Sequence, residues 1–218
     1  MNGLSDSVAW PSRDPEWVAQ VVLMGLINLI PIVGMMALLG WMLAALDNLR
    51  ENRQVLPQAG FSYIRRGVDL FVVYLVYGLV LAMAWLVILA VGLGILALPG
   101  GRGTVLGVAV LLLGYAAVAI AALALLVLSP PIILATDRGG IPGGLNVPNL
   151  VAMATADVNE TLRVGLFALV AFLIGGMGAL VCLVGQVFTV PYGYAALARV
   201  VQHYEQTAGV TYVAAAGL

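Results

Sequence analysis

The sequence is poor in charge, and this shortage is its most informative feature. Only 9% of the 218 residues are charged, 63% are hydrophobic, and all nine basic residues are arginine. A soluble domain carries about a quarter charged residues, so a soluble fold of this chain would have too little polar surface. The arginines are scattered and the net charge is −1, which excludes the basic patch of a nucleic-acid-binding protein.

Residues suited to catalysis or metal binding are equally scarce. The single cysteine, Cys182, excludes an internal disulfide and a cysteine metal cluster. The single histidine, His203, cannot form a metal site alone. We expect it at the surface or membrane interface, with axial ligation of a haem or chlorin as the alternative. No His-Glu-x-x-His motif, paired intramembrane aspartates or phosphate-binding glycine loop with its lysine is present. The sequence thus predicts no enzyme activity, no catalytic or metal-binding residues and no cofactor.

Four long runs of the chain contain no charged side chain. They cover residues 18–46, 70–98, 104–136 and 164–198. About 20 apolar residues suffice for a helix to cross the ~30 Å hydrocarbon core of a bilayer, and every run is longer. The runs predict an all-α integral membrane protein. It has a polar N-terminal lead at 1–17 without a cleavable signal peptide, one membrane domain at 18–201 and a short tail at 202–218.

The two central runs predict a transmembrane helical hairpin. Residues 99–103 between them read Pro-Gly-Gly-Arg-Gly, and such helix breakers indicate a tight turn. A second breaker-rich stretch, at 136–144, predicts a loop after the third run. Residues 149–163 then predict either an amphipathic helix at the membrane interface or an aqueous extension of the last helix.

The first and last runs each carry helix breakers near the middle. These are Pro31 and Gly34 in the first run and three glycines within 175–178 in the last. Each run is too long for one straight crossing, so it either kinks as it crosses or turns back as a re-entrant hairpin. Short cytoplasmic loops collect arginine. Hairpins divide the nine arginines eight to one between the two faces, whereas single crossings divide them six to three. We therefore favour hairpins, with both termini in the cytoplasm.

Amide side chains lie beside these breaks. Asn28 precedes Pro31, and Gln186 precedes Pro191. Breaks free backbone carbonyls, which an amide can satisfy, and an amide can also bind a ligand there. Hydrogen bonding between helices is the commoner role of such residues. The candidate polar and hinge positions are Asn28, Pro31, Gly34, Gly175, Gly176, Gln186 and Pro191.

Basic residues gather in the loop between the first two runs. Arginines near a membrane surface attract anionic lipid headgroups with about 1 kcal/mol each. The candidate headgroup contacts are Arg50, Arg53, Arg65 and Arg66.

Motifs at both ends of the chain resemble one prokaryotic membrane family. They are Asp14-Pro-Glu-Trp17, Leu29-Ile-Pro-Ile-Val-Gly34 and Cys182-Leu-Val-Gly-Gln-Val-Phe-Thr-Val-Pro-Tyr192. The family is catalogued as domain of unknown function 4013, and the likeness extends from about residue 14 to residue 204. The resemblance implies a multi-helix fold in a bacterial or archaeal cell membrane and carries over no activity.

Two functions stay open at this point. The favoured one is a non-enzymatic structural or accessory subunit, because small-residue helix faces are abundant and no charge lies in the apolar runs. Its expected partners are membrane lipids and other membrane protein subunits, with no nucleic acid. The alternative is a transporter or channel for a neutral or lipid-like solute, with its site at the broken helices.

Overall fold

The computed structural model describes residues 6–98, 103–178 and 182–216, and every regular element in these ranges is a helix. The all-α fold class is therefore confirmed for the described chain. Residues 182–184 and 208–216 are described by their backbone alone, so the side chain of Cys182 lies outside the described residues. The chain forms two compact units, one of residues 1–73 and 127–218 and the other of residues 74–126.

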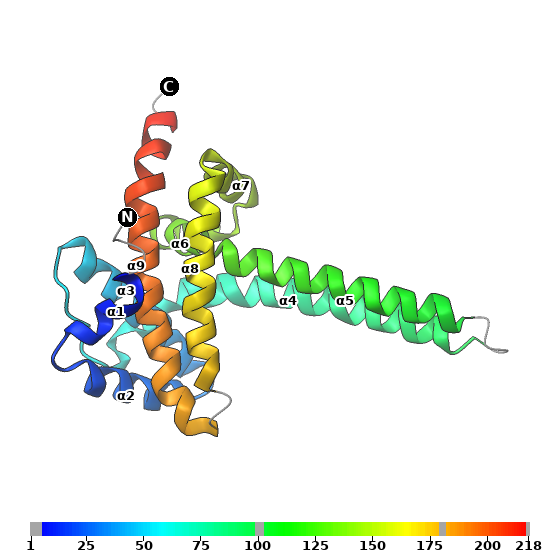
Figure 1. The fold of residues 1–218 in the computed structure, drawn as a ribbon, viewed down its shortest axis with the longest axis horizontal. Coiled ribbons are helices and arrows are strands. Elements are labelled where there is room, and N and C mark those ends of the chain that lie inside the picture. The colour runs from blue at the N-terminus through cyan, green and yellow to red at the C-terminus, as the bar shows by residue number, and fades with distance from the viewer. Residues whose placement is uncertain (1–5, 99–102, 179–181, 217–218) are drawn as a thin grey trace. The chain divides into compact units, whose positions relative to one another are not determined.

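The larger unit is built around α3 (Val33–Arg50), whose side chains from Ala37 to Leu46 are nearly all buried. The long helix α9 (Cys182–Ala216) packs against α3 and runs beside α8 in the opposite direction (Figure 1). The other helices within this unit are α1 (Asp6–Ala9), η1 (Trp10–Arg13), α2 (Trp17–Asn28), η2 (Phe61–Tyr63), α6 (Ser129–Leu145), α7 (Val147–Ala156) and α8 (Val158–Met177). Helix α4 (Ile64–Leu96) begins in this unit, and α5 (Thr104–Val127) ends in it.

Hydrogen bonds from buried side chains attach the N-terminal lead and the loop 51–60 to this core. Asp14 is buried, and its carboxylate accepts the backbone N–H of Glu16 and of Leu56, both at 2.8 Å. The Trp41 indole N–H donates to the carbonyl of Pro57 at 2.8 Å. These bonds satisfy polar groups that burial would otherwise leave unpaired.

The first apolar run is interrupted at Pro31. Helix α2 ends at Asn28 and α3 begins at Val33, which donates its N–H to the carbonyl of Pro31 at 2.7 Å. Ile32 between them has φ 67° and ψ −62°, the geometry of a strained γ-turn. The sequence located this interruption correctly. Whether the two helices form a re-entrant hairpin in a bilayer stays a prediction.

The third run and the predicted loop after it differ from expectation. The run is divided at Leu128, and α6 starts at Ser129 with Pro130 and Pro131 in its first turn, where proline is favoured. Helix α6 then continues through most of the breaker-rich stretch at 136–144, with a kink at Gly140, where φ is 60°. Where a loop was expected, the segment is two helical pieces joined by a kink at the non-helical Gly140.

The segment 149–163 is not one helix either. Asp157 separates α7 from α8, and its carboxylate accepts the N–H of Glu160 at 3.0 Å. This is one half of a capping box, which starts a new helix. Residues 158–163 extend the last apolar helix, as one alternative expected for the whole of 149–163, while α7 is a separate short helix. Whether this extension lies in water stays a prediction.

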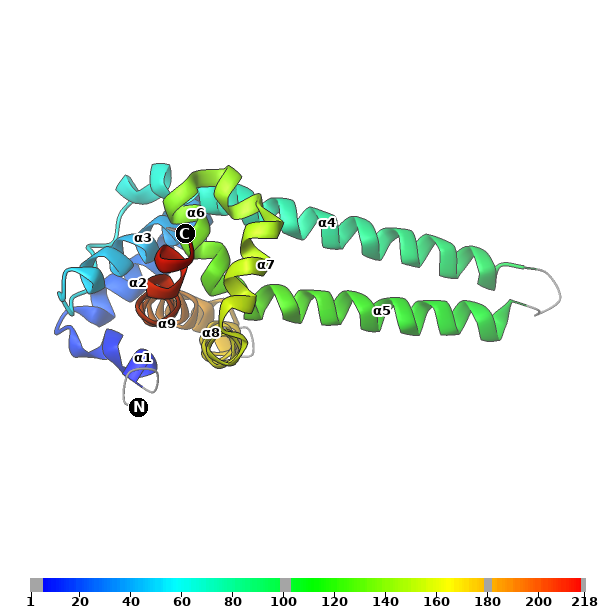
Figure 2. The same ribbon diagram turned by 90° about the horizontal axis from the view of Figure 1, so that it is seen from above.

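In the smaller unit, α4 and α5 run alongside each other (Figure 2). Leu111 of α5 lies against Gly92 of α4, and Ile88 of α4 lies against Gly114 of α5. Most of the outward side chains are large and apolar, and Val105 and Leu113 are 84% and 73% exposed. Such a surface is stable in lipid or against another apolar protein, but not in water.

Within the described ranges, three helical segments are long and apolar enough to cross a membrane: Phe61–Leu96, Thr104–Val127 and Val158–Met177. In their most apolar stretches only 6%, 0% and 28% of the residues are buried inside the chain. These segments identify the chain as a membrane protein. The first run contributes none of them, because α2 has 12 residues and spans only about 18 Å.

Candidate functional site

Glycine allows α8 and α9 to touch through their backbones. A Cβ atom at Gly193 of α9 would lie 2.6 Å from the carbonyl oxygen of Ala171 and 3.1 Å from the nitrogen of Gly175, both in α8. The hydroxyl of Thr189 then donates a hydrogen bond to the carbonyl of Gly175 at 2.9 Å. This contact holds α8 and α9 together at Gly175 and Gly193.

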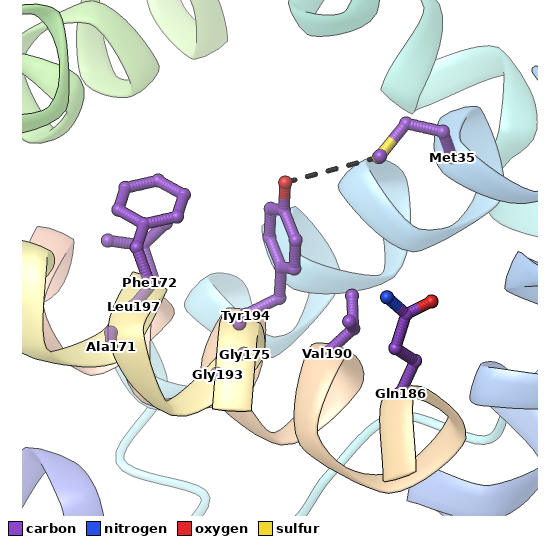
Figure 3. Close-up of a pocket in the computed structure, with 10 residues that line it drawn as sticks. Met35, Ala171, Phe172, Gly175, Gln186, Val190, Gly193, Tyr194 and Leu197 are labelled. Carbon is purple, nitrogen blue, oxygen red and sulfur yellow. Dashed lines mark hydrogen bonds between the residues drawn. The ribbon is translucent and has the colours of Figure 1, made fainter. Parts of the chain in front are cut away.

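Beside that contact, α3, α8 and α9 surround a cavity of about 210 Å³. Its lining is mostly apolar (Figure 3). The lining residues used below are Met35 of α3, Phe172, Gly175 and Gly176 of α8, and Gln186 and Tyr194 of α9. Three of the candidate positions, Gly175, Gly176 and Gln186, are thus brought together at one cavity.

Two polar side chains project from α9 into the space beside α3 (Figure 3). In the described part of the chain, the Tyr194 hydroxyl has only the sulfur of Met35 as a partner, at 4.0 Å, and sulfur is a weak acceptor. The ring of Phe172 packs edge-to-face on the Tyr194 ring, with centroids 6.2 Å apart and planes at 85°. Among the described residues, no side chain or backbone group hydrogen-bonds the amide of Gln186, so two polar groups face an apolar space.

Three other candidate positions meet at the break of the first run. A Cβ at Gly34 would lie 2.7 Å from the Cα of Asn28, so glycine is needed where α3 starts beside the end of α2. The Oδ1 atom of Asn28 is buried and has no hydrogen-bond partner within the described ranges. Asn28, Pro31 and Gly34 therefore form a cluster of their own.

The remaining candidate, Pro191, acts on the packing of α2. Proline has no N–H, so the carbonyl of Val187, four residues earlier, receives no helical hydrogen bond from it. Gly25 of α2 lies against this carbonyl so closely that a Cβ would overlap it. A weak Cα–H···O contact fits this approach. Pro191 is buried between helices and does not line the cavity.

A network of ion pairs, which the sequence did not predict, joins four helices of the larger unit. Arg50 of α3 donates to both carboxylate oxygens of Glu205 in α9, at 2.7 and 3.1 Å, and to Asp137 of α6 at 2.8 Å. Arg66 of α4 pairs with Asp47 of α3 and with Asp137, the latter at 3.1 Å. Arg138 of α6 pairs with Glu205 at 2.9 Å.

Two carboxylates of this ion-pair network, Glu205 and Asp47, are held in the charged form. Burial favours the neutral acid at Glu205, but hydrogen bonds from Arg50 and Arg138 outweigh it and lower the pKa of Glu205 below its usual value. At Asp47, hydrogen bonds from Arg66 and Arg50 likewise overcome burial and lower the pKa. Burial opposes the charge of the Arg50 guanidinium, but hydrogen bonds to Glu205 and Asp137 outweigh it and raise the pKa of Arg50.

The four candidate headgroup arginines have different surroundings. Arg50 and Arg66 belong to the ion-pair network, and Arg53 pairs with the neighbouring Glu51 at the surface. Arg65 is exposed and has no ion-pair partner in the part of the chain that the structure describes. Contact with lipid headgroups stays a prediction for all four, and Arg65 is the residue best placed for it.

The Nε2 atom of His203 lies 3.1 Å from the Oε1 atom of Glu160. Over the described residues, no three side chains of His, Cys, Asp and Glu come together in a group that could hold a metal ion. The described contact of His203 is therefore with a carboxylate of α8.

A family model described as "Protein of unknown function (DUF4013)" matches residues 23–184. The match covers most of the chain and confirms the resemblance expected from the motifs, although Asp14–Trp17 and residues 185–192 of the last motif lie outside the matched range. No curated protein matches the chain, and no solved structure matches it either.

Proposed function

The chain belongs to the DUF4013 family of proteins of unknown function, and from that premise we propose that it is a non-enzymatic subunit of membrane assemblies. In this proposal it packs against other membrane proteins and lipid, in the plasma membrane of a prokaryote, with both termini in the cytoplasm. The observation that carries the proposal is the apolar surface of α4 and α5, which the chain itself leaves almost entirely uncovered.

Small residues on this surface support packing against another helix. A Cβ at Gly78 or Gly94 of α4 would meet nothing within 4 Å in the chain itself. Small residues at such positions let a second helix approach closely. A large side chain there is therefore tolerated by the fold and excluded by a close-packed partner.

Copurification from native membranes in a mild detergent tests the subunit role. We expect a stable partner to copurify with the wild-type chain. We expect no partner to copurify with Gly78→Leu, although the thermal unfolding midpoint of the purified variant is unchanged. Leu79→Ala, at an exposed neighbouring position, is the matched control and should retain the partner. A chain that isolates as a lone monomer contradicts the proposal.

The cavity favours a second candidate function, transport of a neutral or lipid-like solute. Its support is the space of about 210 Å³ beside glycines 175 and 176, the position where the sequence predicted a broken helix. Transporters commonly place their sites at such interruptions.

A leaflet-exchange assay in proteoliposomes tests this candidate, with fluorescent diacylglycerol as the probe. Wild-type protein should accelerate exchange, and Gly176→Leu, which fills the cavity from a position with open space around its Cβ, should abolish the acceleration. Gly139→Leu, at a position in α6 that is equally open and remote from the cavity lining, is the control. Exchange no faster than in protein-free vesicles contradicts transport of this probe class.

A further inference from the structure

We propose that the cavity between α3, α8 and α9 binds one uncharged amphiphile, whose hydroxyl or carbonyl oxygen is held by Gln186 and Tyr194. The apolar part of the ligand lies against Met35 and Phe172. This inference deepens the second candidate function, on which it rests for the biological use of the site, but binding itself requires no transport.

The size of the cavity fits part of a lipid-like molecule. A protein cavity of about 150 Å³ holds benzene, and this one has about 210 Å³. Gly176 on its rim is exposed, so a longer apolar tail can extend outward from the cavity. The site therefore selects the polar end of an amphiphile and the first carbons of its chain.

The absence of charge among the described lining residues selects an uncharged ligand. A carboxylate or ammonium group in an apolar site without an opposite charge carries a large desolvation cost. The charged side chains of the ion-pair network are satisfied by one another. A fatty acid anion is therefore excluded, while an alcohol, an ester or a quinone-type carbonyl is accepted.

The two polar side chains supply the recognition. A tyrosine hydroxyl and a glutamine amide can each donate and accept a hydrogen bond. Tyr194 has only a distant sulfur contact, and Gln186 has no partner among the described residues. Polar groups facing an apolar space are costly unless they are paired, and bulk water is scarce at membrane depth. A ligand that offers an oxygen to each of these side chains satisfies both.

Photolabelling of the full chain in lipid nanodiscs tests the proposal. The probe is a hexadecanol that carries a diazirine near its hydroxyl, and matched diazirine analogues of hexadecane and palmitate serve as comparisons. The alcohol is expected to label the peptides that contain Met35 or Phe172, and excess unlabelled hexadecanol is expected to compete. Competition by palmitate or hexadecane equal to that by hexadecanol would overturn the proposal.

Substitutions distinguish recognition of the ligand's polar end from nonspecific hydrophobic binding. Gln186→Leu and Tyr194→Phe keep the side-chain bulk and remove hydrogen bonding, so each should weaken competition by hexadecanol about five-fold, the effect of one hydrogen bond of about 1 kcal/mol. Gly176→Leu should eliminate the labelling, while Gly139→Leu should not change it. Labelling that is insensitive to Gln186→Leu, Tyr194→Phe and Gly176→Leu contradicts the site.

The outcomes distinguish this inference from transport. Saturable labelling together with unaccelerated leaflet exchange supports the binding site and contradicts the transporter. Accelerated exchange without saturable labelling contradicts the binding site alone.

Discussion

At the scale of single residues, Ile32 is the position where the backbone is most unusual. It is one of two described residues other than glycine with positive φ, the other being Asn52. A β-branched residue is strained in this region, whereas asparagine adopts it readily. Asn52 ends α3 in a Schellman motif. The backbone N–H of Arg53 donates to the carbonyl of Asn48, and the backbone N–H of Asn52 donates to the carbonyl of Leu49.

Ile32→Gly is therefore expected to raise the free energy of unfolding by about 1 kcal/mol, because Ile32 is exposed and little packing is lost. Asn52→Gly is the control, with an expected change of under about 0.5 kcal/mol. Reversible unfolding in mixed detergent micelles measures both. A less stable Ile32→Gly variant contradicts strain at this turn.

Glu205 pairs with two arginines of the ion-pair network, Arg50 and Arg138. Glu205→Gln removes a charge from a partly buried position. It should lower the free energy of unfolding by about 1–2 kcal/mol, between the values for exposed and buried ion pairs. Glu51→Gln, in the exposed pair with Arg53, should change stability by less than about 0.5 kcal/mol. Equal effects of the two substitutions would show that the network adds nothing beyond a surface pair.

The pH dependence of stability follows from the lowered pKa values of Asp47 and Glu205. Because both carboxyls bind protons more weakly in the folded chain, the unfolded state takes up more protons as acid is added. Their contribution is complete above the unfolded pKa values of about 4 and is lost as the pH falls through the folded ones. Thermal unfolding midpoints should be flat between pH 7 and 5 and fall below about pH 4, less steeply in Glu205→Gln. A midpoint that rises on acidification contradicts this sign.

None of these ion pairs could be predicted from the sequence. Arg50 and Glu205 are separated by 155 residues, and Arg50 and Asp137 by 87. Local patterns give no information on which distant charges meet. From sequence the loop arginines are recognisable only as a group near the membrane, which points Arg50 and Arg66 to lipid headgroups and gives no sign of their protein partners.

At the scale of helices, the breaks show which signals in the sequence are dependable. The interruption at Pro31 could be predicted, because proline and the nearby Gly34 leave few alternatives. Two other helix starts also have local signals. These are Ser129-Pro-Pro131 at the start of α6 and the Asp157 cap at the start of α8. Both were missed because they lie inside longer apolar or polar stretches. By contrast, the continuation of α6 through its glycines depends on burial of its first turns, which local sequence does not report.

The start of α8 depends on the Asp157 cap. Asp157→Ala removes the acceptor for the Glu160 N–H and should lower the free energy of unfolding by about 1 kcal/mol. Asn159→Ala, in the same turn, is the matched control and should be nearly neutral. Hydrogen exchange of the first α8 amides provides a local readout, with faster exchange expected only in Asp157→Ala. Unchanged exchange in that variant contradicts the capping role.

At the scale of the whole molecule, the apolar character of the chain was evident from composition, while the location of a cavity was not. The sequence singled out Gly175, Gly176 and Gln186 because they lie near breaks, and the structure brings them together at one cavity. Tyr194 and Phe172 complete that cavity and carried no sequence signal, since aromatic residues are common in apolar helices. The lining of such a cavity depends on which helices, distant in the sequence, pack together. The hydrophobic periodicity of one helix does not give that information.

We propose that the first run of this multi-pass membrane protein turns back to the side of the membrane from which it entered. Single cysteines at Ala9, Gln58, Thr104 and Asn146, all exposed, in a Cys182→Ala background, test it by labelling with a membrane-impermeant maleimide from either side of oriented membranes. We expect cysteines at positions 9, 58 and 146 to be labelled from the cytoplasmic side and the cysteine at position 104 from the opposite side. Labelling of positions 9 and 58 from opposite sides would contradict it.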